Sequence, residues 1–242
     1  MDLASLPVKN GFRLRGESIS RLETFVDAAF AIARTMLVIS VGSLPSTMDE
    51  LFEALKRIPT FGVCFVLMCL FWSAHNKWSR RYGMDDGFTT FLSLALVFVT
   101  LVFVFPLRVV MSSALSFFTG GFLPADITLR SQEDLQGSFR VYGLGWIALS
   151  LLLWLLFRHA LRKADELRLD DLERIETRRD LRELALMIGV GTLSVALTFA
   201  VRETSNVLLA ALPGFVYSLV GVGQFFIHGS LNREREHIGR PR

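Results

Sequence analysis

The stretch F-T-T-F-L-S-L-A-L-V-F-V-T-L-V-F-V-F-P-L, residues 88–107, contains no charged side chain. Its 20 residues fall within the roughly 17–25 that a helix needs to cross the hydrocarbon core of a bilayer. Six such runs in 242 residues leave no polar surface for a soluble globule, which excludes a soluble enzyme and a disordered chain. The other five lack Asp, Glu, Lys and Arg, apart from Arg34 in the first, and cover 28–48, 58–76, 141–157, 184–201 and 204–231.

These runs predict an all-α fold, an integral membrane bundle of six transmembrane helices in a single membrane domain over residues 1–242. The charged stretch 159–183 alternates acidic and basic residues in helical register, and we expect it to form a cytoplasmic helical hairpin. The spans themselves are expected at about 22–44, 58–78, 88–112, 141–158, 184–202 and 205–229.

The Lys and Arg residues are divided unequally between the two sides that six spans define. Of the 26, 19 fall in the N-terminal segment, the 77–87 loop, the 158–183 stretch and the C-terminal tail, and only 6 fall on the opposite side. Because cytoplasmic loops of membrane proteins carry the excess of positive charge, both termini are predicted to be cytoplasmic. The net charge of +3 and the lack of a basic tract with interleaved aromatic residues argue against nucleic acid as a partner.

Residues suited to catalysis or metal binding are few and scattered. No H-E-x-x-H, G-x-S-x-G or C-x-x-C motif and no phosphate-binding glycine loop is present. The sequence therefore predicts that the protein is not an enzyme and uses no metal and no cofactor. The histidines and cysteines lie apart, without a metal-ligand spacing, at His75, His159, His228, His237, Cys64 and Cys69.

A small set of polar residues falls within the expected spans, where ionisable groups are costly and mark function or a buried structural pair. Asp27 lies near the cytoplasmic end of the first span, and Trp72 and His75 lie near the same end of the second. Two antiparallel neighbours would bring these three residues to a similar depth. We expect the Asp27 carboxylate to accept hydrogen bonds from the indole and imidazole N–H groups, as structural support between the two helices.

These residues also carry a resemblance to a known family. The first span begins with Arg21, Phe25 and Asp27 and continues as A-I-A-R-T-M-L-V over residues 31–38. Together with the features of the later spans, this pattern resembles the transmembrane protein 175 family of potassium channels, of the bacterial six-span type. Those features are Trp72, His75 and Asn76 in the second span and Phe105 and Pro106 in the third.

The resemblance implies a homotetramer in which the first span of each subunit lines a central pore for K⁺ in a bacterial inner membrane. It implies no cofactor beyond the permeant ion, and it places the constriction at Ile32, Thr35 and Ile39. At roughly 100° per residue these three side chains fall within about 60° of one another, so they form one stripe. Such stripes are also ordinary packing surface. The alternative is therefore a non-conducting membrane scaffold, or a proton or small-substrate carrier, on the same fold.

The chain departs from the family pattern at three positions. Val26 replaces a serine, Asn76 replaces a second histidine, and Arg34 stands where the family has an aliphatic residue. A ring of four guanidinium groups inside a cation pore would repel K⁺, but Arg34 lies about 100–160° around the helix from the stripe. We therefore expect Arg34 to face neighbouring helices and to act as a modifier of conduction or of assembly.

Overall fold

The computed structural model describes residues 6–9, 11–16, 18–39, 45–201, 204 and 206–227. A hairpin of two short antiparallel strands, β1 (Val8–Lys9) and β2 (Phe12–Arg13), precedes the helices. The helices in chain order are α1 (Arg21–Ile39), α2 (Met48–Leu55), α3 (Ile58–Tyr82), α4 (Gly87–Phe118), α5 (Gln132–Arg162), α6 (Asp171–Ala200), α7 (Val207–Ala210) and α8 (Leu212–Phe215).

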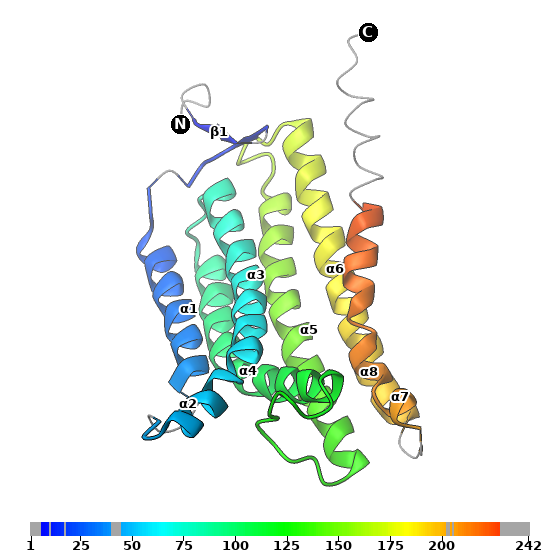
Figure 1. The fold of residues 1–242 in the computed structure, drawn as a ribbon. Coiled ribbons are helices and arrows are strands. Elements are labelled where there is room, and N and C mark those ends of the chain that lie inside the picture. The colour runs from blue at the N-terminus through cyan, green and yellow to red at the C-terminus, as the bar shows by residue number, and fades with distance from the viewer. Residues whose placement is uncertain are drawn as a thin grey trace.

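The long helices run side by side in a bundle, with α1 at one edge and α7–α8 at the other (Figure 1). α4 packs against α1, α3 and α5, and α5 packs in turn against α6. The β1–β2 hairpin lies at the end of the bundle where α3 ends and α6 begins, and α2 lies at the opposite end. The edge position leaves α1 with neighbours on only part of its circumference.

Four helical segments are long and apolar enough to cross a membrane, Met48–Tyr82, Gly87–Phe118, Gln132–Arg162 and Asp171–Ala200, so the chain is a helical membrane protein. A shorter apolar helix covers Leu212–Ile227. α1, with 19 residues, and this last helix fall on the two other expected spans. That they also cross the bilayer, which would make six spans, stays a prediction.

The helices extend beyond the charge-free runs because polar residues cap them. α4 begins at a capping box in which Asp86 accepts from the Thr89 amide and the Thr89 side chain accepts from the Asp86 amide. Ser131 and Asp134 start α5 in the same way, so that this helix begins nine residues before the expected span at 141. Side-chain caps satisfy the free N–H groups of a first turn, which makes a polar helix start stable.

The region of the last expected span, 205–229, contains a helix break. α7 ends at Ala210 and α8 begins at Leu212 with Pro213 in its first turn. Proline has no backbone N–H and its ring clashes with the preceding turn, so a helix restarts at this residue more readily than it continues through it.

α5 and α6 approach one another closely at two glycines. A Cβ atom added at Gly143 would lie 2.5 Å from the Val195 side chain, and one added at Gly191 would lie 2.8 Å from the Ile147 side chain. Small residues at helix contacts allow such close backbone approach, which is a principal source of helix association in lipid. This pair therefore forms a tightly packed part of the bundle.

Candidate functional site

α1 has one buried and one exposed face. Val26, Phe30, Ala33 and Leu37 are at most 1% exposed and recur at the spacing of one helical stripe. The remaining face, called the open face of α1 below, is exposed within the described part of the chain, and Ile32 on it is 58% exposed. This face also carries the exposed residues Arg21, Phe25, Ala28, Ala31 and Thr35.

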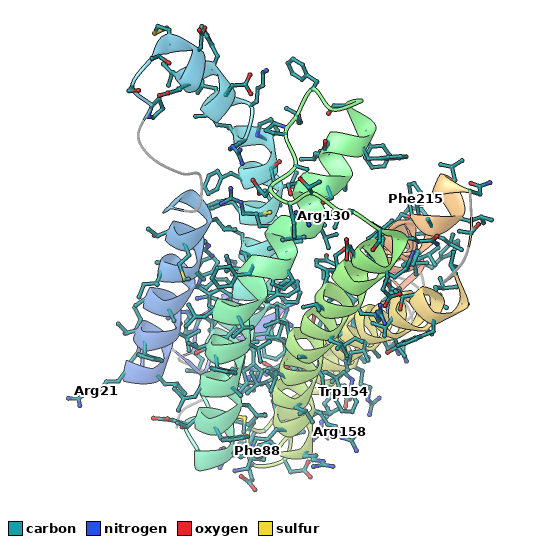
Figure 2. All side chains as sticks on the ribbon, turned by 90° about the horizontal axis from the view of Figure 1, so that it is seen from below. Arg21, Phe88, Arg130, Trp154, Arg158 and Phe215 are labelled. Carbon is teal, nitrogen blue, oxygen red and sulfur yellow. The ribbon has the colours of Figure 1, made fainter. Side chains whose placement is uncertain are left out.

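Two of the three expected constriction residues, Ile32 and Thr35, therefore lie on the open face of α1. The Thr35 hydroxyl donates to the Ala31 carbonyl at 2.9 Å. This bond satisfies the donor and leaves the oxygen able to accept or to approach a cation. The Ile39 side chain lies outside the described residues. Figure 2 shows Arg21 at the tip of α1, pointing away from the bundle.

The opposite side of α1 is anchored to α3 by a polar contact. The Trp72 indole Nε1–H donates to Oδ1 of Asp27 at 2.7 Å, and both residues are half-buried. This is the expected hydrogen bond. A neutral donor on a carboxylate within a span keeps the charge solvated without admitting water.

The expected contact between His75 and Asp27 is wrong. His75 is 2% exposed and its Nε2 pairs with the Ser93 hydroxyl of α4 at 3.1 Å. Three residues along a helix amount to a rotation of about 60°, which is enough to turn His75 from α1 toward α4. Asn76 lies half-buried on the following position of α3. His75 therefore supports the α3–α4 contact and does not join the Asp27 pair.

Arg34 faces α3, as its angle from the stripe predicts. Its guanidinium carbon lies 5.1 Å from the centroid of the Trp72 ring and 5.5 Å from that of Phe65. Its Nε and Nη2 atoms are buried and have no hydrogen-bond partner within the described part of the chain. The charge is thus held by two aromatic faces, a favourable arrangement for a desolvated cation.

A second anchor, at the C-terminal end of α1, was missed by the sequence analysis. Arg108 of α4 donates from Nη1 to the Leu37 carbonyl at 3.2 Å and forms a salt bridge with Asp126 through Nε at 2.6 Å. Arg57, which precedes α3, binds the same carboxylate. The last carbonyls of a helix lack a partner within the helix itself, and Arg108 donates to one of these carbonyls. The one available signal was an arginine directly after the charge-free run that ends at residue 107.

The segment before α1 is attached to the start of α6, a contact that the sequence analysis also missed. Arg15 donates to Glu173 from Nη2 at 2.7 Å and from Nη1 at 3.1 Å, and the two side chains are 3% and 0% exposed. Arg13 binds the more exposed Asp170 at 2.6 Å. Glu173 is recognisable in the sequence only as the last residue of the α6 capping box. Its partner Arg15 lies 158 residues away in the chain, so no local sequence pattern indicates this pair.

A polar cluster also joins α4 to α5 at this end of the bundle. Asp86 binds His159 at 2.8 Å and Lys163 at 3.2 Å. Burial alone would raise the pKa of Asp86, but hydrogen bonds from His159, the Thr89 amide and Lys163 outweigh it and hold this pKa well below its ordinary value. The carboxylate is therefore a fixed negative charge at the start of α4.

A cavity of about 410 Å³ lies where α4, α5 and α8 meet, and its wall includes Phe118, Phe139 and Phe215 but no charged side chain. The described residues also hold no group of three or more His, Cys, Asp or Glu that could bind a metal ion. The open face of α1 is therefore the candidate functional site.

Comparisons with known proteins show which proteins this chain is similar to. A family model described as the endosomal/lysosomal potassium channel TMEM175 matches residues 21–106, from the start of α1 to Pro106 in α4. A protein of Marivirga tractuosa named "Potassium channel" is 31% identical over 213 residues, which cover 86% of this chain and 85% of that protein. The chain belongs to the TMEM175 family.

Solved structures of TMEM175 proteins have the same fold. The crystal structure of a threonine-to-alanine variant of the potassium channel MtTMEM175, in complex with a nanobody–MBP fusion protein, aligns with a TM-score of 0.79 at 29% identity. That alignment covers 95% of this chain and 100% of the other. A lysosomal potassium-selective channel TMEM175 homologue from Chamaesiphon minutus aligns at 0.57 with 18% identity, covering 86% of this chain and 95% of the other, and shows likeness of fold alone. The resemblance found in the sequence is confirmed.

Proposed function

We propose that this chain forms a potassium-favouring cation channel, a homotetramer in which α1 of each subunit lines a central pore. The observation that carries the proposal is the two-sided character of α1. One face is buried against α3 and α4 and anchored through Asp27 and Trp72, while the other leaves the side chains of Ile32 and Thr35 exposed within the described part of the subunit. Family membership and the printed names of the relatives support the same function.

Four copies of α1 arranged around an axis would bring their open faces together. A head-to-tail arrangement of identical subunits closes into a ring when the rotation between neighbours fits, and four is such a closed solution. Ile32 would then form one apolar ring, Thr35 a ring of hydroxyls, and Ile39 a second apolar ring. Apolar rings of small diameter oppose hydration of the pore and so restrict flux.

Selectivity in such a pore comes from the cost of removing water from the ion. The sequence has no T-V-G-Y-G loop whose carbonyls could replace the hydration shell. The Thr35 oxygen, whose proton is engaged by the Ala31 carbonyl, is left free to contact a partly dehydrated cation. K⁺ gives up its water more readily than the smaller Na⁺, which favours K⁺ without a rigid filter.

The orientation of the channel follows from the charge distribution, and the kind of membrane follows from the resemblance to the bacterial six-span type. We assign it to a bacterial inner membrane, as a multi-pass protein surrounded by lipid, with both termini on the cytoplasmic side and six spans per subunit. The permeant K⁺ is the only ion required, and the proposal includes no cofactor and no nucleic acid. The charged ends of α5 and α6 then lie in the cytoplasm.

Flux measurements on purified protein in liposomes test the proposal. We expect K⁺ flux above Na⁺ flux, and an increase of about tenfold for Ile32→Asn, because an amide at the constriction stabilises water there. Leu144→Asn is the matched control, since Leu144 on α5 is 60% exposed, close to the 58% of Ile32. An equal increase for both variants would contradict the assignment of the pore to α1.

An intact tetramer without flux, also after Arg34→Ile, would favour the alternative of a scaffold or a proton or small-substrate carrier. The paired charges of Asp27 and Arg34 on one side of α1 are the feature that such a carrier would use. Under that alternative the Ile32 and Thr35 variants would alter assembly alone.

A further inference from the structure

Arg34 and Asp27 share one aromatic ring. The Trp72 N–H donates to the Asp27 carboxylate at 2.7 Å, and the Arg34 guanidinium lies over the face of the same indole at 5.1 Å from its centroid. Phe65, seven residues earlier on α3, flanks the guanidinium at 5.5 Å. The Asp27 carboxylate thus lies at the edge of the Trp72 indole, and the Arg34 guanidinium lies over its face.

The two charges act on one another through this ring. They are seven residues apart on α1, about 10 Å along the helix axis, and the buried Nε and Nη2 atoms of Arg34 have no hydrogen-bond partner within the described residues. Donation of the indole N–H to an anion increases the electron density of the ring, and the attraction of the ring for a cation rises with that density. Asp27, Trp72 and Arg34 together carry no net charge, but no carboxylate binds the Arg34 guanidinium directly within the described residues.

The position of Arg34 relates this charge to the proposed pore. Arg34 directly precedes Thr35 in the chain, and its side chain leaves α1 on the side away from the open face. Its distance from the pore surface is then about one helix diameter, roughly 10 Å. In surroundings of low dielectric constant a charge acts over such a distance, and four copies act together.

We infer that Arg34 is a conductance-determining residue. Its four guanidinium groups set a positive potential behind the pore wall that limits the rate of K⁺ passage, and the Asp27–Trp72 pair offsets part of that potential so that cations still pass. The inference rests on the proposed channel function and adds to it the residue that sets the rate. Arg34 acts through its electrostatic potential at the pore and does not contact the permeating ion.

Single-channel recordings from the reconstituted full-length protein in 0.1 M and 1 M KCl test this inference. Arg34→Met keeps an unbranched side chain between the two rings and removes the charge, and Arg34→Lys keeps the charge. We expect Arg34→Met to raise the K⁺ conductance at least about threefold in 0.1 M KCl. The ratio to the parent protein should fall toward one in 1 M KCl, where the screening length shortens from about 10 Å to about 3 Å. Arg34→Lys should stay close to the parent protein.

The outcomes separate this inference from the proposed function. A conducting parent protein with unchanged Arg34→Met conductance, or an equal rise for Met and Lys at both salt concentrations, would overturn the inference alone. Silence of every protein, Ile32→Asn included, would overturn the channel function and the inference with it. Arg34→Gln is the second neutral variant. Loss of the tetramer in both neutral variants, with Arg34→Lys assembled, would assign Arg34 a structural role in place of an electrostatic one.

Discussion

α1 and the α5–α6 pair are held in the bundle in different ways. α5 and α6 meet along closely packed faces, and Gly143 and Gly191 leave no room for even one more carbon atom. α1 lies at the edge and is fixed by one buried stripe and by point contacts, Trp72 to Asp27 near one end and Arg108 to the Leu37 carbonyl near the other.

The difference teaches how a helix can be positioned accurately and still keep an unfilled face. Close packing on all sides would bury Ile32 and Thr35, whereas polar contacts at two heights fix the rotation of α1 about its axis with few neighbours. Hydrogen bonds are directional, so they set orientation where packing alone would allow a helix to turn.

The largest effect is expected where the segment before α1 joins α6. Arg15→Met leaves the fully buried Glu173 carboxylate without its main partner, and breaking a buried pair in this way costs about 3–5 kcal/mol of unfolding free energy. Arg13→Met is the control, because its main partner Asp170 is 41% exposed, exposed pairs contribute about 1 kcal/mol or less, and its Nη1 lies no closer than 3.8 Å to Glu173. Thermal unfolding of the detergent-solubilised protein gives both values. Similar losses for the two variants would show that burial of the Arg15 pair is unimportant.

Overpacking should disrupt the α5–α6 contact more than any equivalent change on α1. Gly191→Leu forces a side chain against Trp146 and Ile147 and should cost about 3 kcal/mol. Gly189→Leu, two residues away on α6, meets nothing within 4 Å and should change the melting temperature little. Size-exclusion chromatography after a temperature series measures the loss of folded protein. Equal tolerance of both substitutions would contradict close packing as the basis of this contact.

Loss of the polar anchor should loosen α1 without unfolding the bundle. Trp72→Phe keeps a ring for Arg34 but removes the donor to Asp27, at a cost of about 1.5 kcal/mol for a hydrogen bond to a charged group. Hydrogen exchange in α1 should rise, while exchange in α5 and α6 stays unchanged.

Trp154→Phe is the control for the anchor variant. Trp154 is half-buried on α5 and lies beside Arg158 (Figure 2), whose guanidinium is 4.8 Å from the centroid of its ring. Its indole makes no hydrogen bond within the described part of the chain. Faster exchange in α1 for this control as well would mean that the Asp27 bond is not the cause.

The smallest effect is a pH dependence at the start of α4. The folded-state pKa of Asp86 is depressed, so its ionised form stabilises the fold above the unfolded-state pKa of about 3.9. This contribution is lost as the pH falls through the lower folded-state value. Asp86→Asn keeps a capping oxygen but loses the ion pairs with His159 and Lys163, so it should destabilise by about 1 kcal/mol or less at pH 7, and its difference from the parent protein should shrink below pH 4. Asp85→Asn, on an exposed neighbour, should show no such difference in unfolding experiments at either pH.

Much of the fold could be predicted from the distribution of charge along the chain. The run 88–107 lies within α4, the runs at 58 and 141 lie within α3 and α5, and the run at 184 lies within α6 except for its last residue, because a membrane helix cannot carry unpaired charge through its length. The ends of the helices were less predictable, since the caps at Asp86 and Ser131 lie in polar sequence. Pro213 was the visible signal for the break in the last helix.

Contacts of the candidate site were predictable only between neighbouring helices. The Asp27–Trp72 bond follows from two antiparallel spans of similar depth, and the direction of Arg34 follows from its angle around α1. His75 was assigned to the wrong neighbour because the sequence does not say that α4 packs beside α3 on that side. The Arg15–Glu173 and Arg108–Leu37 contacts join distant segments, and no periodicity marks them.

The shared indole constrains the order in which this site can evolve. Arg34 can be exchanged for an aliphatic residue while Trp72 continues to serve Asp27. Replacement of Trp72 first would instead remove two contacts in a single step, the hydrogen bond to Asp27 and the aromatic face that Arg34 contacts. Lineages that lose the tryptophan should therefore have lost the arginine beforehand, whereas tryptophan without arginine should persist as a stable intermediate.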